Sequence, residues 1–198
     1  MMRKIFIYLS FIFLTFLITN KAFAIGPDVF VQSTVNRAAE ALGGNASIEE
    51  KVQILKDIAN ETVDVRGIGF YSLGAHRKGL SKDQLNEYEK VFTEYFLKSF
   101  SSRLSEYSNP MIKVNSKKKI NDNYTIVSST LVATDTRPEV KIDWRIYTKN
   151  PDNLLIRDLI IEGLSLARTQ KEEFSSIINS NDGKIEALLK NLSDFVIK

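Results

Sequence analysis

Residues Leu154–Phe174 read LLIRDLIIEGLSLARTQKEEF and contain the change of structure that decides the fold. The segment begins as an Ile/Leu-rich strand, is interrupted at Gly163, and continues as a helix behind Thr169, where a capping box begins. Two carboxylates, Asp158 and Glu162, lie four residues apart in the strand, so their side chains are expected on one face. The segment predicts a last strand that leads directly into a helix, and it raises the question of what the two carboxylates do.

Paired carboxylates can share acid/base work when their surroundings push their pKa values apart. The alternative is that they face solvent or pair with Arg145 and Arg157, and that Glu162-Gly163 shapes the turn into the helix. The chain has one histidine, His76, and no cysteine, so a nucleophile–histidine pair or a His-rich metal site would have to use that residue. We therefore expect no catalytic site, no metal and no cofactor.

The first 24 residues have the layout of a secretory signal peptide. Arg3 and Lys4 form a positive start, Ile5–Thr19 carries no charge, and Ala22-Phe23-Ala24 supplies the small residues that signal peptidase needs. The alternative is a retained membrane anchor, but the apolar run is shorter than the roughly 20 residues that span a bilayer. We predict cleavage after Ala24, secretion across the inner membrane, and a single mature domain over residues 25–198.

The charge balance changes once that segment is removed. The chain has 27 Lys+Arg and 24 Asp+Glu, and three of the basic residues, Arg3, Lys4 and Lys21, lie in the predicted signal peptide. The mature chain then carries 24 residues of each sign and no formal net charge. A nucleic-acid partner is not expected, because its binding depends on positive charge.

The mature chain divides into a helical first half, a strand-rich middle and a helical tail. Capping boxes at Ser47 and Ser81 open two helices, and the second helix has an aromatic stripe that ends before Asn109-Pro110. Residues 63–79 are expected to form a weak helix or a close-packed turn. Strands are expected at 111–115, 124–133, 140–147 and 154–161, with turns at 117–123, 134–138 and 150–153, and the final helices are separated by Asp182-Gly183.

Short turns between neighbouring strands favour an antiparallel arrangement. The predicted fold is α+β: a curved, mainly antiparallel sheet of about four strands, wrapped by N- and C-terminal helices. The aromatic stripe would face the alternating apolar residues of the strands, and the two surfaces would form either a filled core or the walls of an apolar pocket. Periodicity alone does not distinguish such a pocket from a filled core.

Two blocks of the sequence resemble a known family. Tyr71–Lys78, leading into the aromatic helix, resembles the first conserved block of the MlaC-type periplasmic phospholipid-binding proteins, also called the toluene-tolerance family. Val140–Arg145 and Arg157–Leu166, followed by Gln170–Phe174, resemble the second block. The order and spacing agree over most of the mature chain. The sequence departs from the family pattern at His76, where members usually carry an aromatic residue.

The resemblance implies a soluble, monomeric carrier of glycerophospholipids that maintains outer-membrane lipid asymmetry. It would exchange lipid with an outer-membrane lipoprotein–porin complex and with the inner-membrane MCE-domain protein of an ABC transporter. The bound phospholipid is then the only expected ligand. The alternatives are a ligand-free adaptor, a carrier of another lipid such as a hopanoid, and an NTF2-like enzyme with a small polar cavity. The residues expected to line the lipid pocket are Phe70, Phe92, Tyr95, Phe96, Phe100, Leu131, Ile142, Trp144, Ile146, Leu159, Ile161 and Leu164.

Overall fold

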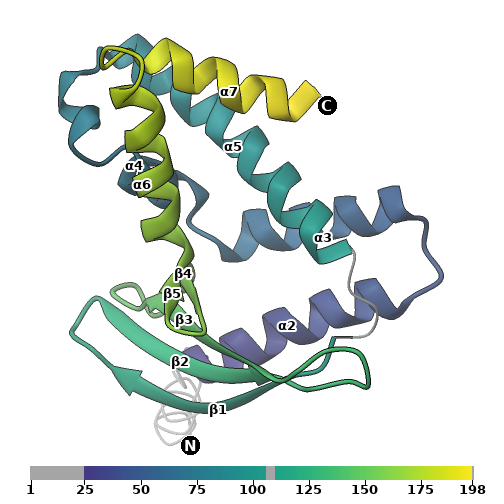
Figure 1. Cartoon of the computed structure of the whole chain (residues 1–198). Coiled ribbons are helices and arrows are strands. Elements are labelled where there is room, and N and C mark those ends of the chain that lie inside the picture. The colour runs from purple at the N-terminus through teal and green to yellow at the C-terminus, as the bar shows by residue number, and fades with distance from the viewer. Residues whose placement is uncertain (1–24, 106–109, 198) are drawn as a thin grey trace, which may run out of the picture.

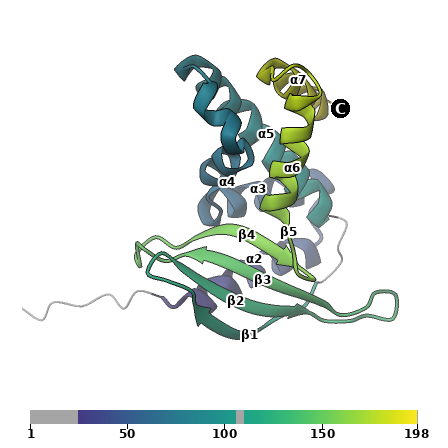
Figure 2. The same ribbon diagram turned by 60° about the vertical axis from the view of Figure 1, so that its left-hand side comes forward.

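The computed structural model describes residues 25–105 and 110–197, so the predicted signal peptide and the predicted end of the aromatic helix at Asn109 lie outside the described residues. The helices lie above one face of an open sheet (Figures 1 and 2). The helical elements are α2 (Pro27–Gly43), α3 (Ile48–Thr62), α4 (Val65–Ser72), the 3-10 helix η1 (Gly74–Gly79), α5 (Lys82–Ser105), α6 (Leu166–Asn179) and α7 (Ile185–Ile197). The strands are β1 (Ile112–Lys119), β2 (Tyr124–Leu131), β3 (Val140–Tyr147), β4 (Leu155–Ile161) and β5 (Leu164–Ser165).

The sheet confirms the predicted α+β class and the antiparallel arrangement. Its strand order is β1-β2-β3-β4-β5, and every neighbouring pair is antiparallel. Four of these strands were expected; the fifth is the two-residue β5, which pairs with the end of β4. Helix α2 packs against β1 and β2, and α6 packs against β4.

The inner face of the sheet is set by strict alternation along β2 and β3. Val127 and Leu131 of β2 and Trp144 of β3 are buried, whereas Lys141 and Arg145 are exposed. The two strands pair in register from end to end, so their apolar side chains form one continuous surface. This confirms the prediction of one buried and one wet face.

Strand β1 is longer than the sequence predicted. The run Lys117–Lys119 was expected in a turn, but it continues the strand and pairs with β2, after a register shift between Val114 and Ser116. β1 is an edge strand, where lysine side chains tolerate the strand conformation because they reach solvent. Lys117 also forms an ion pair of 2.7 Å with Asp28 of α2. A basic run is therefore compatible with a strand at this position.

Two of the three predicted capping boxes are confirmed. The Ser47 hydroxyl accepts the Glu50 N–H at 3.2 Å, and Ser81 does the same for Gln84. The third box is wrong, because α6 begins at Leu166 and Ser165 is its N-cap, accepting the Arg168 N–H at 3.1 Å. The helix therefore begins closer to the strand than its Thr-x-x-Glu spacing suggested.

Helices α4 and α5 approach each other closely at Gly69. A Cβ atom at this position would lie 2.6 Å from Cδ1 of Phe92, which is too short for a real contact. The Tyr88 hydroxyl donates a hydrogen bond of 2.9 Å to the Gly69 carbonyl and joins the same two helices. The glycine-rich region 63–79 is thus a short helix that packs closely on α5, in agreement with the expectation, followed by the mostly exposed 3-10 helix η1.

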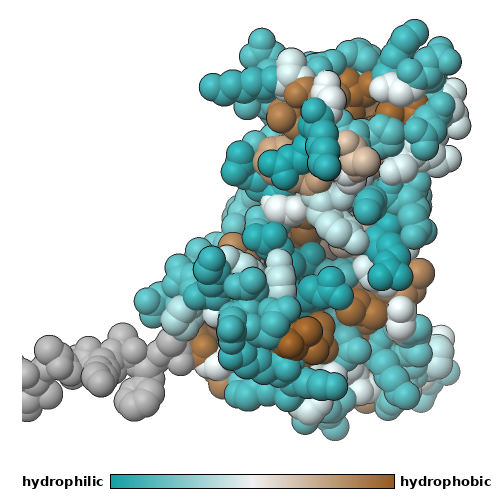
Figure 3. Space-filling view, turned by 90° about the vertical axis from the view of Figure 1, so that its left-hand side faces the viewer, coloured by the Kyte–Doolittle hydropathy of each residue, from teal (hydrophilic) through white to brown (hydrophobic). Residues whose placement is uncertain are grey.

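One side of the molecule carries mainly polar residues at its surface (Figure 3). Figure 3 shows one side of the molecule as mostly hydrophilic, with apolar residues in small patches between polar ones. Within the described part of the chain, no helix is both long enough and apolar enough to cross a bilayer.

Candidate functional site: an apolar cavity between the sheet and the helices

A cavity of about 380 Å³ lies between the inner face of the sheet and helices α2, α3, α5 and α6. Its volume falls in the range of known small-molecule sites. From the helices it is lined by Thr34, Val35, Ala38, Leu42, Leu55, Ile58, Ala59, Thr62, Phe92, Tyr95, Phe96, Ser99, Phe100, Arg103, Leu104, Leu166, Ala167, Thr169, Gln170 and Glu173. Val63, Ile68, Pro110, Ile112, Leu131, Ile142, Trp144, Ile156, Asp158, Leu159 and Ile161 complete the wall.

The aromatic stripe of α5 forms one wall. Phe92, Phe96 and Phe100 recur at helical spacing, with ring centroids 6.0 and 5.8 Å apart, and the last two rings are nearly parallel. Phe92 is buried against Phe174 of α6, whereas Phe96 and Phe100 are only partly buried. The stripe thus passes from filled core at one end to cavity wall at the other.

Most of the residues expected to line a pocket lie on this cavity: Phe92, Tyr95, Phe96, Phe100, Leu131, Ile142, Trp144, Leu159 and Ile161. Phe70, Ile146 and Leu164 do not line it. The Phe70 ring is partly buried on α4, and the guanidinium groups of Arg66 and Arg77 lie 4.9 and 4.4 Å from its centroid. Ile146 is fully buried in the core near the far end of β3, and Leu164 is 59% exposed in β5.

Helices α2 and α3 contribute wall residues that the sequence analysis did not name. They are Thr34, Val35, Ala38 and Leu42 on α2, and Leu55, Ile58, Ala59 and Thr62 on α3. Their spacing of three and four residues was a detectable signal. Periodicity marks the inner face of a helix, however, and does not say whether that face meets a neighbour or a hollow.

Asp158 does not face solvent, and it does not pair with an arginine. It is buried, and its carboxylate accepts hydrogen bonds from the Ser165 hydroxyl at 2.6 Å and the Ala167 N–H at 3.0 Å. Both donors belong to the N-terminus of α6, where the helix dipole favours a negative charge. Arg157 pairs instead with Asp64. Asp158 therefore fixes the start of a helix.

Glu162 lies in a tight turn rather than beside Asp158. Its φ is +49° and that of Gly163 is +82°, as in the two-residue hairpin turns that require positive φ at both positions. The Glu162 carboxylate accepts the Lys141 N–H of β3 at 2.5 Å. The expectation that Glu162 and Gly163 shape the turn agrees with the structure. Within residues 25–105 and 110–197, no group of acidic, His or Cys side chains is arranged to hold a metal.

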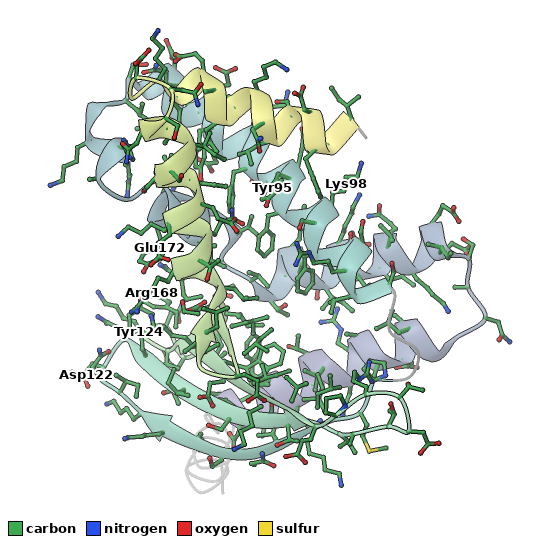
Figure 4. All side chains as sticks on the ribbon, viewed as in Figure 1. Tyr95, Lys98, Asp122, Tyr124, Arg168 and Glu172 are labelled. Carbon is green, nitrogen blue, oxygen red and sulfur yellow. The ribbon has the colours of Figure 1, made fainter. Side chains whose placement is uncertain are left out.

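Three polar residues of the cavity wall, Tyr95, Gln170 and Glu173, are joined by hydrogen bonds where α5 meets α6. The Tyr95 hydroxyl donates to the Gln170 side-chain oxygen at 3.3 Å, and the Gln170 amide donates to Glu173 at 3.2 Å. Figure 4 labels Tyr95 on α5. Burial raises the pKa of the Tyr95 hydroxyl, and the nearby Glu173 carboxylate raises it further. At physiological pH, Tyr95 is therefore neutral and acts as a hydrogen-bond donor.

Comparison with known proteins agrees with this architecture. The model of the family described as "MlaC protein" matches residues 32–194. The chain belongs to the MlaC family. It is 25% identical over 187 residues to a protein of Haemophilus influenzae named intermembrane phospholipid transport system binding protein MlaC, covering 90% of this chain and 87% of that one.

A solved structure shares the MlaC fold of this chain. It is the phospholipid-binding protein from Ralstonia solanacearum, determined in complex with a phospholipid. The match has a TM-score of 0.73 at 18% sequence identity and covers 87% of this chain and 98% of that one. The sheet and its covering helices are therefore the shared framework.

Proposed function

We propose that this MlaC-family chain is a periplasmic carrier of glycerophospholipids without catalytic activity. Residues 25–198 would form the mature domain. It would receive and deliver lipid at an outer-membrane lipoprotein–porin complex and at the inner-membrane MCE-domain protein of an ABC transporter, and so maintain outer-membrane lipid asymmetry. The observation that carries the proposal is the apolar cavity between the sheet and the helices. The name of the Haemophilus relative and the phospholipid bound to the Ralstonia protein support it.

The polar groups within the cavity wall point to an apolar occupant. Thr34 and Thr62 donate their hydroxyls to the carbonyls four residues earlier in their own helices, at 2.9 and 2.7 Å. The Trp144 indole N–H donates to Ser129 at 2.8 Å. Asp158 is already engaged by Ser165 and the start of α6. These groups bond within the protein, so the wall presents mainly carbon atoms to a ligand, which suits acyl chains better than a small polar substrate.

The size of the cavity argues against a ligand-free adaptor. When the cavity holds no ligand, its apolar wall meets water or lacks packing partners, and either state costs free energy. Acyl chains would reverse that cost, since each buried methylene contributes about 0.8 kcal/mol. A lipid in the cavity therefore accounts for a hollow that an adaptor would not keep.

Native mass spectrometry of protein purified from a Gram-negative periplasm tests the proposal. We expect a stoichiometric phospholipid adduct, and we expect Leu131→Glu to abolish it, because that side chain is buried in the cavity wall. Ser128→Glu, on the other face of the same strand, is the matched control and should keep the lipid. Circular dichroism checks that both variants are folded. An apo mass that stays unchanged after incubation with liposomes would refute the proposal, and a hopanoid mass would support the alternative lipid.

A further inference from the structure

The cavity wall contains three charged side chains, Arg103, Asp158 and Glu173. Asp158 is buried and bonded to the start of α6. Arg103 and Glu173 are exposed, and they belong to α5 and α6 respectively. Among the described residues, neither forms an ion pair. The wall thus carries one exposed cation and one exposed anion on two different helices.

Arg103 and Glu173 lie at the edge of the cavity, because each side chain lines the cavity and is also exposed to solvent. The two helices meet where the Phe174 ring contacts the rings of Phe92 and Tyr95, at 6.1 and 6.3 Å. From that junction α5 runs away from α6, as Figure 1 shows, so the helices diverge toward the sheet. Glu173 lies next to the junction. Arg103 lies eight residues along α5 from Tyr95, or about 12 Å, on the same side of the helix.

Other charged residues nearby are directed elsewhere. Lys98 of α5 donates to the Val196 carbonyl of α7 at 2.8 Å. Figure 4 shows Arg168 and Glu172 on the side of α6 that is turned away from α5. Neither they nor Lys98 line the cavity. Arg103 and Glu173 are therefore the exposed charged side chains of the cavity wall, and both act on the Tyr95 hydroxyl, whose pKa Glu173 raises and Arg103 lowers.

We propose that Arg103 and Glu173 form a headgroup subsite that selects zwitterionic phospholipids over lipids with a net negative headgroup. A guanidinium group pairs well with phosphate oxygens, which every glycerophospholipid carries. A carboxylate attracts a headgroup ammonium and repels a headgroup whose only charge is the phosphate. Specificity then comes from the repulsive Glu173 as much as from the attractive Arg103. This inference rests on the proposed carrier function and adds a preference that the family match does not supply.

Competition between two headgroups on the same acyl chains tests the subsite. Delipidated protein is incubated with vesicles containing equal amounts of phosphatidylethanolamine and phosphatidylglycerol, and native mass spectrometry measures the ratio of the two bound lipids. The wild-type ratio should favour phosphatidylethanolamine by roughly threefold, the size expected for exposed charge pairs. Glu173→Gln should bring the ratio toward one, and Glu173→Arg should invert it. Raising the salt concentration should weaken the preference.

Substitution of Arg103 should change the amount of bound lipid rather than the ratio of the two lipids. Arg103→Gln should lower the loading of both lipids, because both carry a phosphate, and it should not bring the ratio toward one. Lys90→Gln and Glu94→Gln are matched controls, since both residues are exposed on α5 and neither lines the cavity. Loading that mirrors the vesicle composition and is unchanged in the Glu173 variants would overturn the subsite while leaving the carrier function intact. Failure to load either lipid would overturn the carrier function itself.

Discussion

Removing the Asp158 carboxylate should destabilise the protein strongly, because the carboxylate holds the start of α6. The carboxylate accepts two hydrogen bonds, from Ser165 at 2.6 Å and from the Ala167 N–H at 3.0 Å, in a site that is only 4% exposed. Hydrogen bonds to a charged group contribute about 1.5–3 kcal/mol each. Part of that gain is offset by the cost of burying the charge. We expect Asp158→Ala to lower the free energy of unfolding by about 3 kcal/mol.

Urea unfolding followed by circular dichroism measures this loss. With a denaturant slope of about 2 kcal/mol per M, the midpoint of Asp158→Ala should fall by about 1.5 M. Asp158→Asn keeps an acceptor for the Ala167 N–H and should lose about half as much. Asp135→Ala, in the exposed β2–β3 connection, is the control and should unfold like wild type. If Asp158→Ala unfolds with the wild-type midpoint, the assignment of this carboxylate to the start of α6 is wrong.

Three further predictions concern the helices around the cavity. Gly69→Ala places a Cβ 2.6 Å from the Phe92 ring and should cost about 1–3 kcal/mol in urea unfolding, whereas Gly79→Ala meets no atom within 4 Å and should be neutral or slightly stabilising. Burial raises the pKa of the Tyr88 hydroxyl in the folded state, so the unfolded state ionises first as the pH rises. The free energy that the neutral, buried Tyr88 contributes to folding is therefore complete below the unfolded-state pKa of about 10 and is lost progressively above it. Tyr88→Phe should reduce the alkaline loss by up to about 1.4 kcal/mol per pH unit, measured by urea unfolding between about pH 8 and pH 11. Ser47→Ala removes the N-cap of α3 and should lower the free energy of unfolding by about 1 kcal/mol in the same assay.

Local patterns predicted the parts of the fold that local forces determine. The alternation along β3 and the capping boxes at Ser47 and Ser81 depend on neighbouring residues, and the structure confirms them. Asp158 was expected to face solvent or an arginine, but the start of α6 covers it, and that contact lies outside the strand. Strand β4 also contains a register shift: Arg145 of β3 lies opposite Asp158 and Ile146 lies opposite Ile156, so Arg157 has no strand neighbour on β3. Such a shift ends the simple alternation of faces, and it is set by the pairing with β3 rather than by the sequence of β4 alone.

The hollow itself depends on how α6 leaves the sheet. The turn at Glu162-Gly163 and the N-cap Ser165 start this helix directly at β4, and Figures 1 and 2 show it rising away from the strands. Phe174, which contacts α5, lies eight residues or about 12 Å along α6 from Leu166. Helix α5 packs mainly on α3, α4 and α7 rather than on the strands. Its partly buried rings therefore face a space instead of the sheet. The apolar stripe of α5 would look the same in sequence if the helix lay flat on the strands, so periodicity could not distinguish a cavity from a core.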